Sequence, residues 1–259
     1  MNSTIIYEFP LNERIRVFIR LERLFQQFNH HLNGETVADR RAAIHVLLEI
    51  MAIFKRNDLK SEILKELERN TNSLNKIAQN SEQKGIDTQK LQELLHQLSQ
   101  LSKNLYTMTG KIGGHVMESE LFQSIAQRSA MPGGTCSFDL PEFHYWLEQE
   151  NAICLNDLQD WSQPFINIGQ AIDLILNFIR SSHTQTHEVA LSGFFQINLD
   201  THLPHQLLII SVDKTLPYFV EISGGKHRCT LRFMAPSNHH QRSVQSTENV
   251  PFTLTRCIF

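Results

Sequence analysis

The stretch PFINIGQAIDLILNFIR (164–180) decides the fold. Apolar side chains cover most of the circumference of the helix that it predicts, and only a few polar residues interrupt them. Such a helix is expected to be central and buried, or partly covered by a second subunit. The polar interruptions exclude a membrane span, which needs about 18 or more consecutive apolar residues.

The sequence changes character directly after this helix, near residue 182. Upstream segments have the three-to-four-residue apolar spacing of helices, whereas short strand-like runs broken by Gly, Pro and Asn follow. We therefore predict an α+β protein with an N-terminal all-helical domain (1–181) and a small C-terminal, mainly antiparallel β domain (182–259). The strand-like segment TIIYEF (4–9) is expected to add to the β domain.

Apolar periodicity also predicts the earlier helices. The first is expected to begin after Pro10, and the next two to cover residues 36–55 and 58–77. Leucines then recur in heptad-like spacing from Leu91 to Leu105, which predicts an antiparallel hairpin with the third helix because the seam spans only about two heptads. Two further helix starts are predicted from capping patterns, at Asp87 and at Asp139 with Glu142.

The β half contains one clear hairpin, YFVEISGGKHRCTLRFM (218–234), with Gly224 and Gly225 in its turn. Strict alternation in its second arm directs one set of side chains inward and a basic set outward. The basic set consists of Lys226, Arg228 and Arg232, with Thr230 among them. Other strands are expected at 189–199, at 207–212 and in the last ten residues, and 236–249 is expected to form a polar loop.

Composition limits the classes of function. The 259 residues carry a net charge of -3, which disfavours a strongly basic nucleic-acid binder. The N-terminus lacks the pattern of a signal peptide, and the four scattered cysteines form no CxxC pair. We therefore expect reduced thiols in a cytoplasmic protein. The Gly-rich segments IGGH (112–115) and PGGT (132–135) match no phosphate-binding loop, and no cofactor is expected.

Two sets of side chains, one of histidines and one of a cysteine with a histidine, suggest metal binding or catalysis. Both sets also have structural explanations. His183 with His187, and His202 with His205, have ligand-like spacings, but the usual zinc patterns are absent, so we interpret them as loop histidines without a metal. Cys136, with His144 as its base, suggests a cysteine-dependent enzyme. Turn and capping residues explain that segment without catalysis, and we expect a structural thiol.

The arginines Arg16, Arg20 and Arg23 share one face of the first predicted helix. The planar guanidinium group suits the recognition of carboxylates. Pairing with acidic residues of neighbouring helices explains the stripe equally well, and the spacing alone does not distinguish the two interpretations.

Five strings together resemble the ZapD family of bacterial cell-division proteins. They are YEFPLNERIRVFIRLERLFQQ (7–27), ILKELERN (63–70), SAMPGGTCSFDLPEFHYWL (129–147), LSGFFQ (191–196) and ISGGKHRCTLRFM (222–234). They occur in the family's order and cover almost the whole chain.

The resemblance implies a helical domain followed by a β domain and a cytoplasmic homodimer without enzymatic activity. It further implies that the protein binds the C-terminal tail of the tubulin-like protein FtsZ and bundles FtsZ filaments at the mid-cell division ring during septation. The matching strings place Arg20, His144, Arg228 and Arg232 in the tail site, to which the two basic faces add Arg16, Arg23 and Lys226. Glu118 and Glu120 depart from the family pattern, which has a basic residue in that region.

Three hypotheses therefore stand. The leading one is a dimeric, metal-free FtsZ-tail-binding factor that neither inserts into membranes nor binds nucleic acid. The second is a cysteine-dependent enzyme that uses Cys136 and His144. The third is a helical adaptor for another acidic partner.

Overall fold

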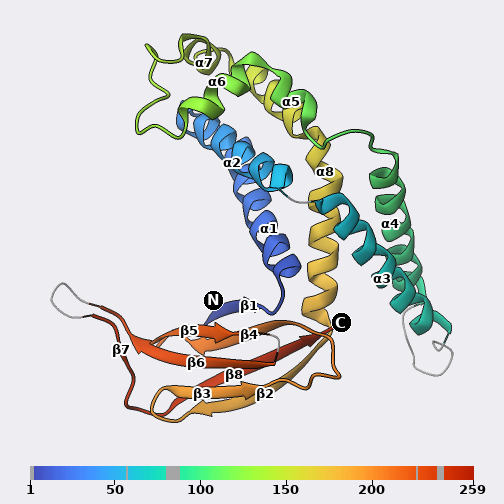
Figure 1. Ribbon diagram of the computed structural model, residues 1–259, viewed down its shortest axis with the longest axis vertical. Coiled ribbons are helices and arrows are strands. Elements are labelled where there is room, and N and C mark those ends of the chain that lie inside the picture. The colour runs from blue at the N-terminus through green and yellow to red at the C-terminus, as the bar shows by residue number, and fades with distance from the viewer. Residues whose placement is uncertain (1–2, 57, 80–87, 226, 238–241) are drawn as a thin grey trace. The chain divides into compact units, whose positions relative to one another are not determined.

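The computed structural model describes residues 3–56, 58–79, 88–225, 227–237 and 242–259. It confirms the α+β class: helices occupy the N-terminal part and antiparallel sheets the C-terminal part (Figure 1). The chain forms two compact units. The helical unit comprises residues 20–175, and the β unit comprises residues 1–19 and 176–259.

The helices follow the predicted apolar stripes closely. The first four are α1 (Glu13–Leu32), α2 (Val37–Arg56), α3 (Leu59–Gln79) and α4 (Thr88–Thr107). Leu91, Leu98, Leu101 and Leu105 are buried, and α4 packs against α3, which confirms the predicted hairpin (Figure 1). Asp87, the predicted cap of α4, lies outside the described residues. The remaining helices are α5 (Gly114–Glu118), α6 (Glu120–Arg128), α7 (Pro141–Leu147) and α8 (Asn151–Ser181).

The helix predicted over 164–180 is the second half of the longer α8. Pro164 therefore lies inside the helix, where its ring removes one backbone hydrogen bond. The apolar circumference is buried within the chain itself: Ile168, Ile172 and Ile175 have no exposed surface. The exposed positions form one narrow stripe, which is polar apart from Ile166. Of the two expectations for this helix, burial within the chain is the one observed.

The first helix begins after Pro10, as predicted, whereas the predicted cap of α7 was wrong. Pro10 itself is the last residue of the strand β1 (Thr4–Pro10), and α1 starts at Glu13, where the Asn12 side-chain oxygen accepts a hydrogen bond of 3.0 Å from the Ile15 N–H. Asp139 does not cap α7. Its carboxylate accepts a hydrogen bond from Arg128 at 3.2 Å, and α7 begins after Leu140 without a side-chain cap.

The β unit is built from two antiparallel sheets. One has the order β1-β4-β8-β2, with β4 (His205–Asp213), β8 (Val250–Ile258) and β2 (His183–Ala190). The other has the order β3-β6-β5, with β3 (Phe194–Asn198), β6 (Arg228–Ala235) and β5 (Phe219–Gly224), and the short β7 (Val244–Gln245) pairs with β6. Buried residues of both sheets form one apolar core, so the unit is a sandwich. The pairing of β1 with β4 confirms that residues 4–9 add to the sheet.

The structure corrects three details of the β half. A strand over 183–190 was missed, so His183 and His187 lie in β2 rather than in a loop. The predicted strand 189–199 is interrupted by a tight turn at Leu191–Gly193. The polar segment 236–249 contains the short strand β7.

Gly193 explains the interrupted strand. Its φ is +69°, in the left-handed region that other residues adopt at a cost, and an added Cβ would lie 2.7 Å from the Ser246 carbonyl oxygen. The turn therefore requires glycine at this position, and it redirects the chain from one sheet to the other.

We predict that Gly193→Ala lowers the free energy of unfolding by about 1–2 kcal/mol or more, because both the φ angle and the added contact are unfavourable. Chemical denaturation measures the change. Gly225→Ala is the matched control, since no atom lies within 4 Å of its added Cβ. Equal stability of the two variants would contradict the assignment of strain to Gly193.

Candidate binding surfaces

The arginines divide into a group with partners inside the chain and a group without them. Arg40 is 7% exposed and donates to the carbonyl oxygens of Leu147 (2.6 Å) and Gln149 (2.9 Å), which fixes the connection between α7 and α8. Other arginines with a partner include Arg14, Arg16, Arg41, Arg69, Arg128, Arg180 and Arg256. Within the described part of the chain, no hydrogen bond or ion pair involves the side chains of Arg20, Arg23, Arg228, Arg232 and Arg242.

The predicted arginine stripe on α1 is split by this division. Arg16 forms an ion pair with Glu13, one turn earlier in the same helix, with the two atoms 2.5 Å apart. Arg20 and Arg23 are exposed, and neither is paired with any described residue. Pairing with acids of neighbouring helices, the alternative explanation of the stripe, is therefore not observed for Arg20 and Arg23.

The basic strand face lies on β6. Cys229, Leu231 and Phe233 are buried, whereas Arg228 and Arg232 are exposed, which confirms the predicted alternation. Arg232 is opposite Phe194 of β3 and Glu221 of β5 in the register of the sheet. Lys226, which was predicted to extend this face, lies outside the described residues.

His144 is an exposed residue of α7. Its neighbours Phe143 and Trp146 point the other way into a buried aromatic cluster, where the Trp146 indole N–H donates to Asp157 at 2.8 Å and the Arg41 guanidinium lies over the Phe143 ring. The buried face of α7 therefore holds the short helix in place and leaves the His144 imidazole accessible.

The predicted site residues fall into both units. Arg20, Arg23 and His144 belong to the helical unit, and Arg16, Arg228 and Arg232 belong to the β unit. The convergence of the helical and strand faces in one pocket stays a prediction. Sequence reasoning did not single out Arg242, which like Arg228 is exposed and has no partner among the described residues; no spacing signal identifies it.

A groove of about 1390 Å³ lies within the helical unit, between the second half of α2 and the segment 109–118. Leu48 and Met51 contribute apolar surface, and charged residues of both signs line it, including Lys111 and Glu118. Glu118, like Glu120, is exposed. Because the charges are mixed, the groove does not select an acidic ligand by charge alone.

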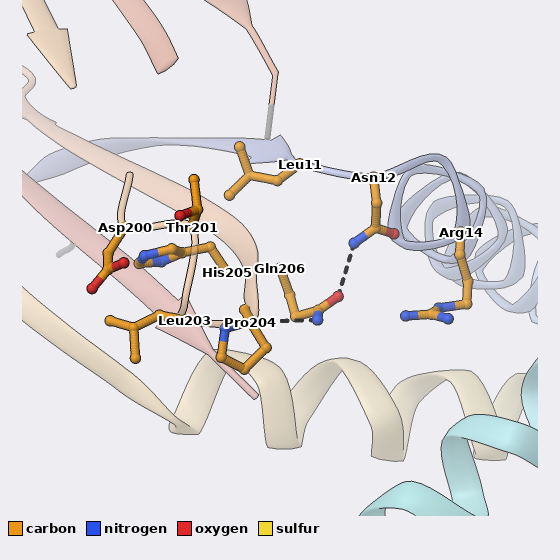
Figure 2. A pocket seen from close by; sticks show the side chains of 9 residues that line it. All are labelled: Leu11, Asn12, Arg14, Asp200, Thr201, Leu203, Pro204, His205 and Gln206. Atoms are coloured by element: carbon orange, nitrogen blue, oxygen red, sulfur yellow. Dashed lines mark hydrogen bonds between the residues drawn. The ribbon is translucent and has the colours of Figure 1, made fainter. Parts of the chain in front are cut away.

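A smaller cavity of about 360 Å³ lies within the β unit, where the loop before β4 meets the start of α1 (Figure 2). Asn12 donates to the Gln206 side-chain oxygen at 2.8 Å across its edge. Burial, together with the positive charge of Arg256, lowers the pKa of His205, so its imidazole is neutral at physiological pH. Among the described residues, no group of three or more His, Cys, Asp and Glu side chains is placed to hold a metal ion.

Among the described residues, the side chains of Cys136 and His144 form no hydrogen bond with each other. The Cys136 thiol is exposed on the loop before α7, and the backbone of Cys136 forms turn hydrogen bonds to Gly133 and Leu140. A nucleophilic thiol needs a base within hydrogen-bonding reach, and the geometry offers the turn role instead.

The other three cysteines are buried, and burial raises the pKa of each thiol, that of Cys257 to about 11. They stay protonated at pH 8 and are shielded from solvent. We therefore predict that a thiol reagent modifies one cysteine per chain in the native protein and four after denaturation. Cys136→Ser should abolish the native reaction, and rapid native labelling of a second cysteine would contradict the assignment.

None of the described helices is long and apolar enough to cross a membrane. This finding agrees with the polar interruptions of α8.

Comparison with known proteins gives consistent matches. The model of the ZapD family, described as a cell division protein, matches residues 19–232. Cell division protein ZapD of Methylococcus capsulatus is 47% identical over 258 residues, which cover all of both chains. The proteins of the same name from Nitrosomonas eutropha and Chromobacterium violaceum are 36% and 33% identical, each over 98% of this chain, and over 99% and 100% of their own lengths.

Proposed function

Because the chain belongs to the ZapD family of cell division proteins, we propose that it binds the C-terminal tail of FtsZ and cross-links FtsZ filaments at the mid-cell division ring. It does so as a cytoplasmic homodimer without catalytic activity or a cofactor. The tail, as the family resemblance describes it, is flexible and mixes acidic with apolar residues.

One observation carries the proposal: Arg20, Arg23, Arg228 and Arg232 are exposed and paired with no described residue. The fold uses other arginines to satisfy its own carbonyl and carboxylate oxygens, so these four guanidinium groups are available to an external ligand. Arginine binds carboxylates through charge-assisted hydrogen bonds, which are stronger than neutral ones. An acidic tail is the ligand that such a set fits.

Bundling follows from two-fold symmetry. A dimer presents two equivalent tail sites, and one dimer can therefore hold tails from two filaments at once. Several large apolar side chains of the helical unit are exposed and offer area for a second subunit. They include Phe138 (83% exposed), Tyr106 (78%) and Tyr145 (69%).

We predict that Arg20→Glu weakens binding of the FtsZ tail by about tenfold or more, because a charge-assisted hydrogen bond contributes about 1.5–3 kcal/mol. Co-sedimentation with polymerised FtsZ and titration with the tail peptide measure the loss. Lys103→Glu is the matched control, since it makes the same change in net charge on the exposed surface of α4.

Raising the salt concentration should weaken wild-type binding, because exposed ion pairs are screened over about 10 Å at 0.1 M.

Cys136→Ser should bundle FtsZ like the wild type. The proposal fails if the folded wild-type protein does not co-sediment with FtsZ, and the tail site fails if Arg20→Glu behaves like Lys103→Glu.

We predict that sedimentation finds a stable dimer at micromolar concentration. Exchanging the exposed aromatic surface for polar residues, as in Phe138→Ser with Tyr145→Ser, should weaken the dimer if that surface lies in the interface. Monomeric wild-type protein that still bundles filaments would contradict cross-linking by a simple dimer.

A further inference from the structure

The strand β1 is one edge of the sheet β1-β4-β8-β2, and among the described residues it pairs with β4 alone. The hydrogen bonds at its two ends show which backbone groups face β4. The Leu11 N–H donates to the Gln206 carbonyl oxygen at 3.0 Å, and the Lys214 N–H donates to the Ser3 carbonyl oxygen at 2.8 Å. Bonded pairs alternate in an antiparallel ladder, so the odd-numbered residues of β1 bond to β4.

The even-numbered residues of β1 therefore direct their backbone groups away from the sheet. Thr4, Ile6 and Glu8 each present an N–H and a carbonyl group outward, and no described residue hydrogen-bonds to these groups. Pro10, the next even-numbered residue, has no N–H, which fits this position because no bond of the ladder is lost there. The edge is thus open to a further strand.

This edge also lacks the features that usually prevent pairing with another chain, such as exposed charged side chains. Ile6 is 54% exposed and Ile5 is 37% exposed. The single charged residue of β1, Glu8, is held by Arg180 at 2.7 and 2.9 Å. The other edge strands expose mainly polar side chains, namely His183, Gln185 and His187 on β2, Gln196 and Asn198 on β3, and Glu221 and Ser223 on β5.

The residues of β1 are complementary to a second β1. When two copies pair antiparallel about a two-fold axis at Ile6, Ile6 lies opposite Ile6 of the second copy, and Thr4 lies opposite Glu8 of the second copy. Even-numbered residues then face each other, so each outward N–H meets a carbonyl oxygen of the other copy. The isoleucines form an apolar cross-strand pair, and the two glutamates stay apart because each faces a threonine.

We propose that β1 pairs with β1 of a second copy of this chain, antiparallel and centred on Ile6, so that the sheets of two β units become continuous. The pairing goes beyond the proposed function and does not depend on FtsZ. Where the helical units also form the proposed dimer, pairing through β1 links one dimer to the next, and more than two filaments can be held together. One pair of short strands is a small contact, so this association is weak and depends on protein concentration.

Disulfide trapping tests the register directly. The Cα atoms of a bonded antiparallel pair are about 5.5 Å apart, which lies within the range of about 4.4–6.8 Å that a disulfide spans. Ile6→Cys, made with Cys136→Ser to remove the exposed native thiol, should therefore form a disulfide-linked dimer of the full-length protein under mild oxidation. Thr4→Cys is the matched control, because its two copies lie about 13 Å or more apart in this register.

We expect Ile6→Cys to cross-link about tenfold or more faster than Thr4→Cys, as measured by non-reducing electrophoresis at several protein concentrations. Gln185→Cys, at an exposed position of the edge strand β2, measures the rate of random collisions. Equal rates for Ile6→Cys and these two controls would overturn the proposal.

A charge at the two-fold centre should prevent the pairing, because Ile6→Lys places two ammonium groups opposite each other. Sedimentation velocity over a concentration series should show self-association about tenfold or more weaker than that of the wild type. Val189→Lys is the matched control, since it makes the same change in charge at a 48% exposed residue of β2, and it should associate like the wild type. Circular dichroism checks that both variants fold, and equal self-association of the two would contradict the proposal.

Titration with the FtsZ tail peptide distinguishes a second copy from another occupant of the edge. If Ile6→Lys weakens tail binding and leaves self-association unchanged, the edge binds that extended chain and the second-copy proposal fails. If Ile6→Lys weakens self-association and leaves tail binding unchanged, the proposal stands. A wild-type protein that does not bind the tail would contradict the proposed function alone, because trapping and sedimentation need no FtsZ.

Discussion

Burial of the apolar surface of α8 is the constraint on which both units depend, because buried residues of this helix belong to each of them. Ile168, Ile172 and Ile175 are fully buried in the helical unit. Leu176 and Ile179 are fully buried in the β unit. Each such side chain contributes about 1.5–3 kcal/mol when it is fully buried. In the β unit the last turn of α8 is also fixed to β1, where Arg180 donates to both carboxylate oxygens of Glu8, at 2.7 and 2.9 Å.

Hydrogen-bond partners inside the chain distinguish the arginines that stabilise the fold from those that can bind an external ligand. Burying a guanidinium costs less free energy when its donors find partners: the Nη1 and Nη2 groups of Arg40 donate to Leu147, Gln149 and Asn151, and its Nε–H is the donor left without a partner among the described residues. Water satisfies the donors of an exposed guanidinium. A ligand carboxylate can replace that water at a small cost in free energy. Arg20 and Arg232 are of this second kind, and the fold loses nothing when they bind a ligand.

Much of the fold was predictable because a helix or strand that buries one face repeats apolar residues at the period of that element. The α3–α4 hairpin and the alternation of β6 were both predicted from spacing and are confirmed. The missed strand β2 has the sequence HTQTHEVA, whose exposed residues give no apolar alternation. Pro164 was expected to begin a helix, but the burial of residues on both sides of it stabilises a continuous α8.

The candidate site was predictable only in part. Spacing placed Arg16, Arg20 and Arg23 on one face, but it could not distinguish an arginine with a partner from one without. That distinction depends on which acids the tertiary fold brings near, and Arg16 proved to be paired with Glu13. Asp139 shows the same limit, since Arg128 takes the carboxylate that was expected to cap α7.

The most direct measurement is a crystal structure of the protein with the FtsZ tail peptide bound. The account predicts peptide carboxylates within about 3 Å of the guanidinium groups of the unpaired arginines, Arg20 and Arg23 on α1 or Arg228 and Arg232 on β6. A peptide whose carboxylates all face solvent, held only by apolar contacts such as those of the groove beside α2, would contradict it.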